Sequence, residues 1–322
     1  MKKLICVMLT VMLILSLFAG CGGTADDGVI TVAIVQQLDH ASLDEIRHAI
    51  EAELEKTAAD KGLTIEYKYF NGQNDSTILN QIGSQVVADQ YDIIIPIATT
   101  AAQCMVTAAE GTDIPIVYAA ISDPAGAGLT GLPNVTGVSD ALNTPFILDM
   151  MFAADPDIEC VGLLYSLSEP NSATPIKEAK EYLEAKGIPY IEKTGHLVDE
   201  VTTAAAALVG RCDAVFTPTD NAVMNVAPNV AETLRNAGIA HYTGADSFVQ
   251  AGSFATCGVN YTELGTYAAQ MAMDVLLTGN VPEFHVMDGG IITVNTSTAE
   301  ALGLDYTVFN SMANTVNAIT VD

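Results

Sequence analysis

Regular alternation of short apolar runs with longer amphipathic stretches is the feature that most constrains the fold of this 322-residue chain. The runs Ile93–Ile97 and Ile114–Ile121 are apolar throughout, which is typical of strands covered by helices on both faces. The alternation begins at Ile30 and continues to about Thr243. Repeated strand–helix units of this kind predict parallel, doubly wound α/β sheets with right-handed connections.

The strand–helix units fall into two series of similar length, so we expect two α/β lobes. A Gly-, Pro- and Asn-rich segment, Gly126–Asn134, lies just before the junction of the two series. Pro228 lies inside an expected helix over residues 222–237 and predicts a kink or a break there. No longer repeat is present, which argues against a solenoid.

Composition narrows the class of partner and excludes several kinds of site. The chain is 50% hydrophobic, which is too apolar for a disordered protein. Its 12 Lys and Arg against 39 Asp and Glu give a formal charge of −27, which argues against binding to nucleic acid or to anionic lipid surfaces. The 6 Cys include no C-x-x-C, so a zinc ribbon or iron–sulfur framework is not expected. We expect no cofactor and no metal site.

The first residues have the layout of an export signal. Lys2 and Lys3 precede an apolar run, Leu4–Phe18, which is shorter than a membrane span. The sequence Ala-Gly-Cys at 19–21 and the Gly/Asp-rich stretch after it resemble the lipobox of bacterial lipoproteins. We therefore expect a signal peptide over 1–20, lipid on Cys21 and a tether over 21–28. The alternative is an ordinary signal peptide with an incidental Cys.

A ligand site is expected where the strands end, because open α/β sheets bind ligands beyond the carboxyl ends of their strands. Neutral hydrogen-bonding groups and carboxylates follow the expected strands in both series, among them Gln37, Thr99, Thr100, Ser122, Asp123, Asn171, Ser172, Thr219, Asp220, Asn221 and Asp246. Arg47, Arg211 and Arg235 fall elsewhere, which disfavours phosphate. The pattern suits a small zwitterion or a polyol.

Catalytic patterns are scarce in this chain. There is no G-x-S-x-G, Walker A, H-E-x-x-H or Rossmann motif, and the five His are dispersed. Cys160 and Cys212 precede strands that would be neighbours, so either free thiols or a disulfide is compatible with the sequence. Asp123, Asp220 and Asp246 suit an ammonium group, but each also suits a simple helix N-cap.

An ordered set of segments is similar to one known family. Together these segments resemble the ABC-transporter substrate-binding protein family that includes tryptophan- and tyrosine-type binding proteins: Val32–Leu54, Asn71–Gln103, Ile114–Leu129, Asn134–Asp140, Pro218–Met224 and Gly244–Asp246. The resemblance extends from about residue 30 to 305. One departure is Gly-Ala-Asp-Ser at 244–247, where the family often has Gly-Asp followed by an acid or Ser.

The resemblance implies the type I periplasmic-binding-protein fold, with two lobes joined by three crossovers. We place the crossovers at Val138–Asp140, Cys257–Val259 and Pro282–Val286. Lobe 1 would then comprise 29–139 and 258–281, and lobe 2 would comprise 140–257 and 282–322. The cleft between them would close on the ligand by hinge motion.

The resemblance also implies an aromatic amino acid as ligand. The contacts it implies are Thr99, Thr100, Ser122, Asp123, Asn171, Ser172, Thr219, Asp220, Asn221 and Asp246. We expect Asp220, or else Asp123, to pair with the ligand's ammonium. Helix N-termini near Thr99–Thr100 and Asn171–Ser172 would receive its carboxylate. Leu38, Tyr165 and Phe248 are the candidates for the apolar side of the pocket, although they equally suit the core.

We therefore predict a monomeric, lipid-anchored binding protein outside the cytoplasmic membrane, working with an ABC permease and ATPase. A sugar or nucleoside receptor on the same fold is an alternative, although a chain with no Trp and 6% aromatics offers little to stack on a sugar ring. A sensor subunit that presents ligand to a membrane receptor would look the same in sequence. An extracellular hydrolase or lyase is disfavoured by the missing nucleophile–base pair.

Overall fold

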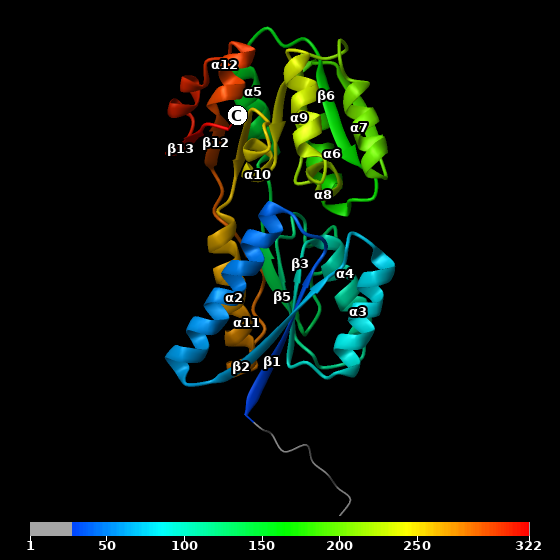
Figure 1. Ribbon diagram of the computed structural model, residues 1–322, viewed down its shortest axis with the longest axis vertical. Coiled ribbons are helices and arrows are strands. Elements are labelled where there is room, and N and C mark those ends of the chain that lie inside the picture. Colours follow the sequence, from blue (N-terminus) through cyan, green and yellow to red (C-terminus); the bar gives the residue numbers. More distant parts are fainter. Residues whose placement is uncertain (1–27, 322) are drawn as a thin grey trace, which may run out of the picture.

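The computed structural model describes residues 28–321 and consists of two α/β lobes stacked along the long axis of the molecule (Figure 1). The predicted signal peptide, Cys21 and the tether up to Asp27 lie outside the described residues. Within 28–321, no helix is both long enough and apolar enough to span a bilayer.

Lobe 1 contains a six-stranded parallel sheet in the order β11-β5-β4-β3-β1-β2. Its strands are β1 (Val29–Gln36), β2 (Thr64–Asn71), β3 (Ile93–Ile97), β4 (Ile116–Ala119), β5 (Val135–Ser139) and β11 (His285–Val286). One face is covered by α2 (Ala41–Lys61) and α11 (Tyr261–Thr278), and the other by α3 (Ser76–Ala88) and α4 (Thr99–Ala108). Every residue of β3 is buried, as expected for a strand covered on both faces.

Lobe 2 contains a seven-stranded sheet in the order β13-β12-β10-β9-β8-β6-β7, in which β12 runs antiparallel to β10. Its strands are β6 (Val161–Ser166), β7 (Tyr190–Gly195), β8 (Ala214–Thr217), β9 (Ala240–Thr243), β10 (Ala255–Gly258), β12 (Ile291–Asn295) and β13 (Thr315–Ile319). Its helices are α5 (Thr144–Ala154), η1 (Pro170–Ser172), α6 (Ala173–Lys186), α7 (Val198–Ala206), α8 (Asn221–Met224), α9 (Ala227–Asn236), α10 (Asp246–Gln250), α12 (Thr296–Leu302) and η2 (Tyr306–Ser311).

The break predicted at Pro228 is present, because the expected helix over 222–237 is divided into α8 and α9 just before that residue. The proline occupies the first turn of α9, where its missing N–H leaves no helical hydrogen bond unmade. The division leaves α8 as a separate short helix that faces the other lobe (Figure 1).

The third crossover lies later than the sequence indicated. The sequence places residues 282–286 in lobe 2, but β11 pairs in parallel with β5 through His285 and Val138, at the edge of the lobe 1 sheet. The chain therefore crosses to lobe 2 after Met287, whose N–H still donates to Ser139 O (3.0 Å). A two-residue strand carries too little sequence pattern to be recognised.

Close packing of α11 on α2 fixes one wall of the space between the lobes. A Cβ atom at Gly265 would lie 2.4 Å from Ile46 O, so only glycine permits this approach. The packing holds Tyr261, the first residue of α11, close to the beginning of α2. Both helix starts therefore face lobe 2.

Candidate functional site

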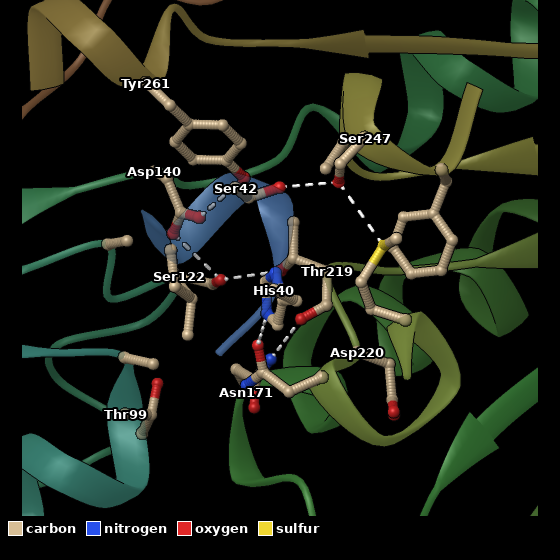
Figure 2. Close-up of a pocket in the computed structure, with 17 residues that line it drawn as sticks. His40, Ser42, Thr99, Ser122, Asp140, Asn171, Thr219, Asp220, Ser247 and Tyr261 are labelled. Atoms are coloured by element: carbon tan, nitrogen blue, oxygen red, sulfur yellow. Dashed lines mark hydrogen bonds between the residues drawn. The ribbon is translucent and has the colours of Figure 1, made fainter. Parts of the chain in front are cut away.

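A small void lies between the lobes, at the carboxyl ends of their central strands (Figure 2). The space measures about 380 Å³ with its mouth included, and about 20 Å³ of it has room for the centre of a water molecule. Lobe 1 and the first crossover contribute His40, Ser42, Thr99, Ser122 and Asp140. Lobe 2 contributes Asn171, Thr219, Asp220, Asn221 and Ser247.

Two loops of lobe 1 reach the void through left-handed backbone. Ala98, between β3 and α4, has φ 76°, and Ala120, after β4, has φ 58°. Residues other than glycine rarely adopt such angles, which cost about 1–3 kcal/mol each. The N–H of Ala98 donates to Ala119 O (3.0 Å), so the two loops are tied together. This strained pair presents Thr99, at the start of α4, to the void.

Asp140 is the carboxylate whose surroundings best suit a cationic group. It is buried, and its Oδ1 and Oδ2 accept hydrogen bonds from Ser122 Oγ (3.0 Å) and Tyr261 OH (3.3 Å). Burial raises the pKa of Asp140, and the two hydroxyls offset this only in part. Among residues 28–321 it takes part in no ion pair. A buried carboxylate of this kind gains most from a cation that arrives with the ligand.

Asp220 has a different environment, although it also lines the void. Its carboxylate accepts from Ser166 N (2.7 Å), Ser172 Oγ (2.7 Å) and Val223 N (2.9 Å), all within lobe 2. The last of these bonds caps α8. Burial raises the pKa of Asp220, while these donors favour its ionised form. The structure therefore assigns Asp220 the capping role that the sequence left open.

The lobes are in contact on either side of the void, so the molecule is closed. Hydrogen bonds join side chains of lobe 1 to side chains of lobe 2 at Gln37–Glu169 (3.1 Å), His40–Asn221 (2.9 Å), Ser42–Ser247 (2.5 Å), Ser122–Thr219 (3.1 Å) and Asp123–Thr174 (2.6 Å). An amino acid can enter only if these contacts separate.

The apolar part of the lining comes from both lobes. Leu43 of α2 and Tyr261 of α11 face Met224 of α8 and Phe248 of α10 across the void. Phe248 is buried and packs edge-on against His241 at 6.4 Å between ring centroids. This combination of thioether, phenol and phenyl groups suits an aromatic side chain.

Several buried polar atoms at the void have no hydrogen-bond partner among the described residues. They are Nδ1 of His40, Oγ1 of Thr99 and Oδ1 of Asn171. Buried polar atoms in native proteins are nearly always paired, so unpaired ones gathered at one cavity indicate a polar ligand.

About half of the residues predicted for the site line the void: Thr99, Ser122, Asn171, Thr219, Asp220 and Asn221. The others lie behind or beside it: Gln37, Leu38, Thr100, Asp123, Ser172 and Asp246. Leu38 is buried in an apolar cluster that includes residues of both lobes, and Asp246 lies beside Glu45 in a separate groove. Tyr165 is also away from the void, where its hydroxyl donates to Glu192 (2.8 Å).

His40 and Ser247 also line the void; they follow expected strands but are not among the predicted contacts. The prediction missed Ser42, Asp140, Tyr261 and Met224. Asp140 follows β5, so the strand-end rule that selected Ser122 after β4 would have found it as well. Ser42 and Tyr261 lie in the first turns of helices, and only the packing of those helices brings them to the void.

The described residues also bear on the chemistry that the sequence left open. No group of three or more His, Cys, Asp or Glu within 28–321 is placed to hold a metal ion. The four described cysteines, Cys160 and Cys212 among them, are free thiols.

Comparisons with known proteins agree with this geometry. Residues 31–312 match the family model described as ABC transporter substrate binding protein. The tyrosine-binding protein of Clostridioides difficile (strain R20291) is 31% identical over 280 residues, which is 85% of this chain and 81% of that protein.

Solved structures add the arrangement of the lobes. The ABC domain from Streptococcus pneumonia in complex with L-Trp matches with a TM-score of 0.82 at 28% identity, covering 89% of this chain and 99% of that one. A substrate binding protein with adhesive properties from Clostridium difficile, ligand-free and open, matches with a TM-score of 0.68 at 29% identity, covering 91% and 100%. At nearly equal identity, the lobes here are arranged more like those of the complex. The chain belongs to the ABC transporter substrate-binding protein family, whose members bind solutes and are not enzymes.

Proposed function

We propose that this chain is the extracytoplasmic, lipid-anchored binding protein of an ABC importer, and that it captures an aromatic amino acid between its lobes by hinge closure. The observation that carries the proposal is the void between the lobes, which combines the buried Asp140 carboxylate with the apolar side chains of Met224, Phe248 and Tyr261. The relatives that bind tyrosine or tryptophan support the choice of ligand.

Each part of a zwitterionic ligand has a partner in this site. The ammonium group pairs with Asp140, and the aromatic ring packs against Phe248 and Met224. Among the described residues, no Arg or Lys lines the void, so the carboxylate depends on neutral donors, such as the unpaired hydroxyl of Thr99 at the start of α4. The positive end of that helix dipole adds to the attraction.

Calorimetric titration of protein that has been unfolded, dialysed and refolded tests the ligand. We expect L-tyrosine or L-tryptophan to bind, and myo-inositol and glucose not to bind. Small-angle scattering should show a smaller radius of gyration with the bound amino acid if closure follows binding. Binding of the polyol in preference to both amino acids would contradict the proposal.

The lipid anchor rests on the Ala19-Gly20-Cys21 sequence. We expect Cys21→Ala to release the protein from the membrane into the soluble fraction, because the acyl chains on this residue hold it there. Fractionation with labelled fatty acid measures both effects. Unchanged membrane association, with no label on the wild-type protein, would show that another element provides the attachment.

A further inference from the structure

A series of hydrogen-bonded side chains, buried or half-buried, connects the lobes beside the void and ends on a buried atom that faces it. Glu169, which follows β6, accepts from Gln37 Nε2 at its Oε1 (3.1 Å) and from Asn221 Nδ2 at its Oε2 (2.8 Å). Asn221 Oδ1 lies 2.9 Å from His40 Nε2. The other ring nitrogen of His40, Nδ1, is buried at the void and has no partner among the described residues (Figure 2).

The orientation of Gln37 is fixed by its other contacts. Its Oε1 accepts from Thr100 N (3.2 Å), and its Nε2 also donates to Asn74 Oδ1 (2.9 Å). Because a backbone N–H can only donate, the Gln37 amide cannot turn over without losing that bond. Oε1 of Glu169 therefore always faces a donor. A proton on this carboxyl has to be on Oε2, which faces Asn221.

The side-chain amide of Asn221 is the group in this hydrogen-bonded series that can turn over. In the observed orientation its Oδ1 accepts from Nε2–H of His40, which leaves a lone pair on Nδ1. A proton on Glu169 Oε2 requires an acceptor, so the amide has to turn over. Its Nδ2 then donates to Nε2 of His40. A neutral imidazole has one N–H, which must then be on Nδ1, facing the void.

The charged groups around these hydrogen-bonded side chains favour the protonated form of Glu169. Burial and the neighbouring Asp220 carboxylate raise the pKa of Glu169 to about 8. At the other end, burial lowers the pKa of His40 and keeps the ring neutral, although Asp39 and Asp44 oppose this. The remaining groups that Glu169 contacts are neutral amides.

We propose that Glu169 is a positioning residue whose protonation, transmitted through Asn221, makes His40 donate a hydrogen bond from Nδ1 to the carboxylate of the ligand. The proposal rests on the proposed function, because it takes an amino acid as the ligand. It supplies a second neutral donor beside the hydroxyl of Thr99, since neither Arg nor Lys is among the described residues that line the void. Glu169 takes one proton from solvent, and His40 loses a proton at Nε2 and gains one at Nδ1. The net uptake is one proton per closure.

The sign of the pH dependence follows from which lobe covers Glu169. When the lobes separate, Gln37 leaves and the pKa of Glu169 returns toward its ordinary value of 4.5. Closure therefore takes up a proton between pH 4.5 and about 8, so binding weakens as the pH rises through this window. The Kd can rise by at most about tenfold for each pH unit, because one proton is taken up. His40 acts in the opposite sense below its ordinary pKa of 6.5, because closure favours its neutral form.

The test is the pH profile of L-tyrosine binding between pH 6.5 and 8.5, measured by calorimetry in buffers of different ionisation enthalpy. Wild-type protein should take up close to one proton near pH 7, and its Kd should rise about tenfold across the range. Glu169→Gln should bind with no proton uptake and with an affinity that does not fall as the pH rises, because its amide N–H permanently donates to Asn221. Glu181→Gln, on the exposed surface of α6, is the matched control and should behave as wild type.

A second measurement reads the tautomer directly. Nitrogen-15 NMR of the His40 ring should show Nδ1–H at pH 6.5 and Nε2–H above pH 8 in wild-type protein, and Nδ1–H throughout in Glu169→Gln. Binding by Glu169→Gln that still weakens as the pH rises, or a wild-type tautomer that does not change with pH, would overturn the proposal. The rings are measured in the L-tyrosine complex, because opening of the lobes breaks the contact between His40 and Asn221. If wild-type protein binds neither tyrosine nor tryptophan, the proposed function fails. If it binds tyrosine with a Kd that does not change between pH 6.5 and 8.5, this proposal alone fails.

Discussion

Asp140 and Asp220 both follow a strand that ends at the void and both are buried, yet their hydrogen-bond donors differ. Asp220 is held by two backbone N–H groups and a hydroxyl, all from lobe 2. Among the described residues, the donors that other residues offer to the Asp140 carboxylate are the hydroxyls of Ser122 and Tyr261. Backbone N–H groups donate in fixed directions, whereas hydroxyl groups can rotate and leave room for a ligand group on the same carboxylate. We therefore base the proposed roles, ligand partner for Asp140 and cap for Asp220, on the donors around each carboxylate rather than on its place after a strand.

Asp140→Asn is the substitution from which we expect the largest loss of affinity, and it tests whether Asp140 pairs with the ligand's ammonium group. Losing one partner of a buried ion pair costs about 3–5 kcal/mol, which corresponds to about two to four decades in affinity. We expect calorimetry to show amino-acid binding nearly abolished, while thermal unfolding stays close to wild type because the amide still accepts from Ser122. Affinity retained within tenfold would remove Asp140 from the role of ammonium partner.

The reverse result is expected for Asp220→Ala. The change removes the cap of α8 and leaves Ser166 N buried without an acceptor, so the free energy of unfolding should fall by about 2–4 kcal/mol. Urea denaturation measures this loss. The protein that remains folded should bind the amino acid, with affinity reduced far less than in Asp140→Asn. If Asp220→Ala is as stable as wild type but no longer binds the amino acid, Asp220 and not Asp140 pairs with the ligand's ammonium group.

Smaller effects are expected from the two serines that donate to these carboxylates, on affinity for Ser122 and on stability for Ser172. Ser122→Ala removes a neutral hydrogen bond to Asp140 and a contact with Thr219, so we expect about fivefold weaker binding. Ser172→Ala should lower stability by about 1 kcal/mol and leave affinity nearly unchanged, because its bond is to Asp220. Calorimetry and urea denaturation on both variants distinguish the two outcomes. Equal loss of affinity in both would contradict the division of roles.

Much of the fold could be predicted because its elements carry strong local patterns. Apolar strands such as β3 and the break before Pro228 follow directly from periodicity and backbone chemistry. The third crossover could not be placed, because β11 is held by the free edge of β5, which is a property of the assembled sheet. The antiparallel course of β12 is likewise decided by packing beside β10.

The site was predicted only in part for a related reason. A rule about strand ends gives the position of a residue along the chain but not the direction of its side chain. Asp123 follows β4 closely, yet its carboxylate turns back to accept from Gly126 N (2.8 Å) and across to Thr174. Ser42 was not selected, because its place at the void depends on how α2 packs against α11.

The late return of the chain to lobe 1 sets an order of assembly. Helix α11 and strand β11 come after all of lobe 2 up to β10, and α11 covers the face of the lobe 1 sheet that α2 alone leaves open. A chain that emerges amino end first therefore displays apolar surface until residue 278 has appeared, and such surface promotes aggregation. A fragment that stops between the lobes keeps α2 but lacks α11, so it has only part of one helical layer. A self-sufficient lobe 1 would instead require residues 29–139 to be spliced directly to 259–287.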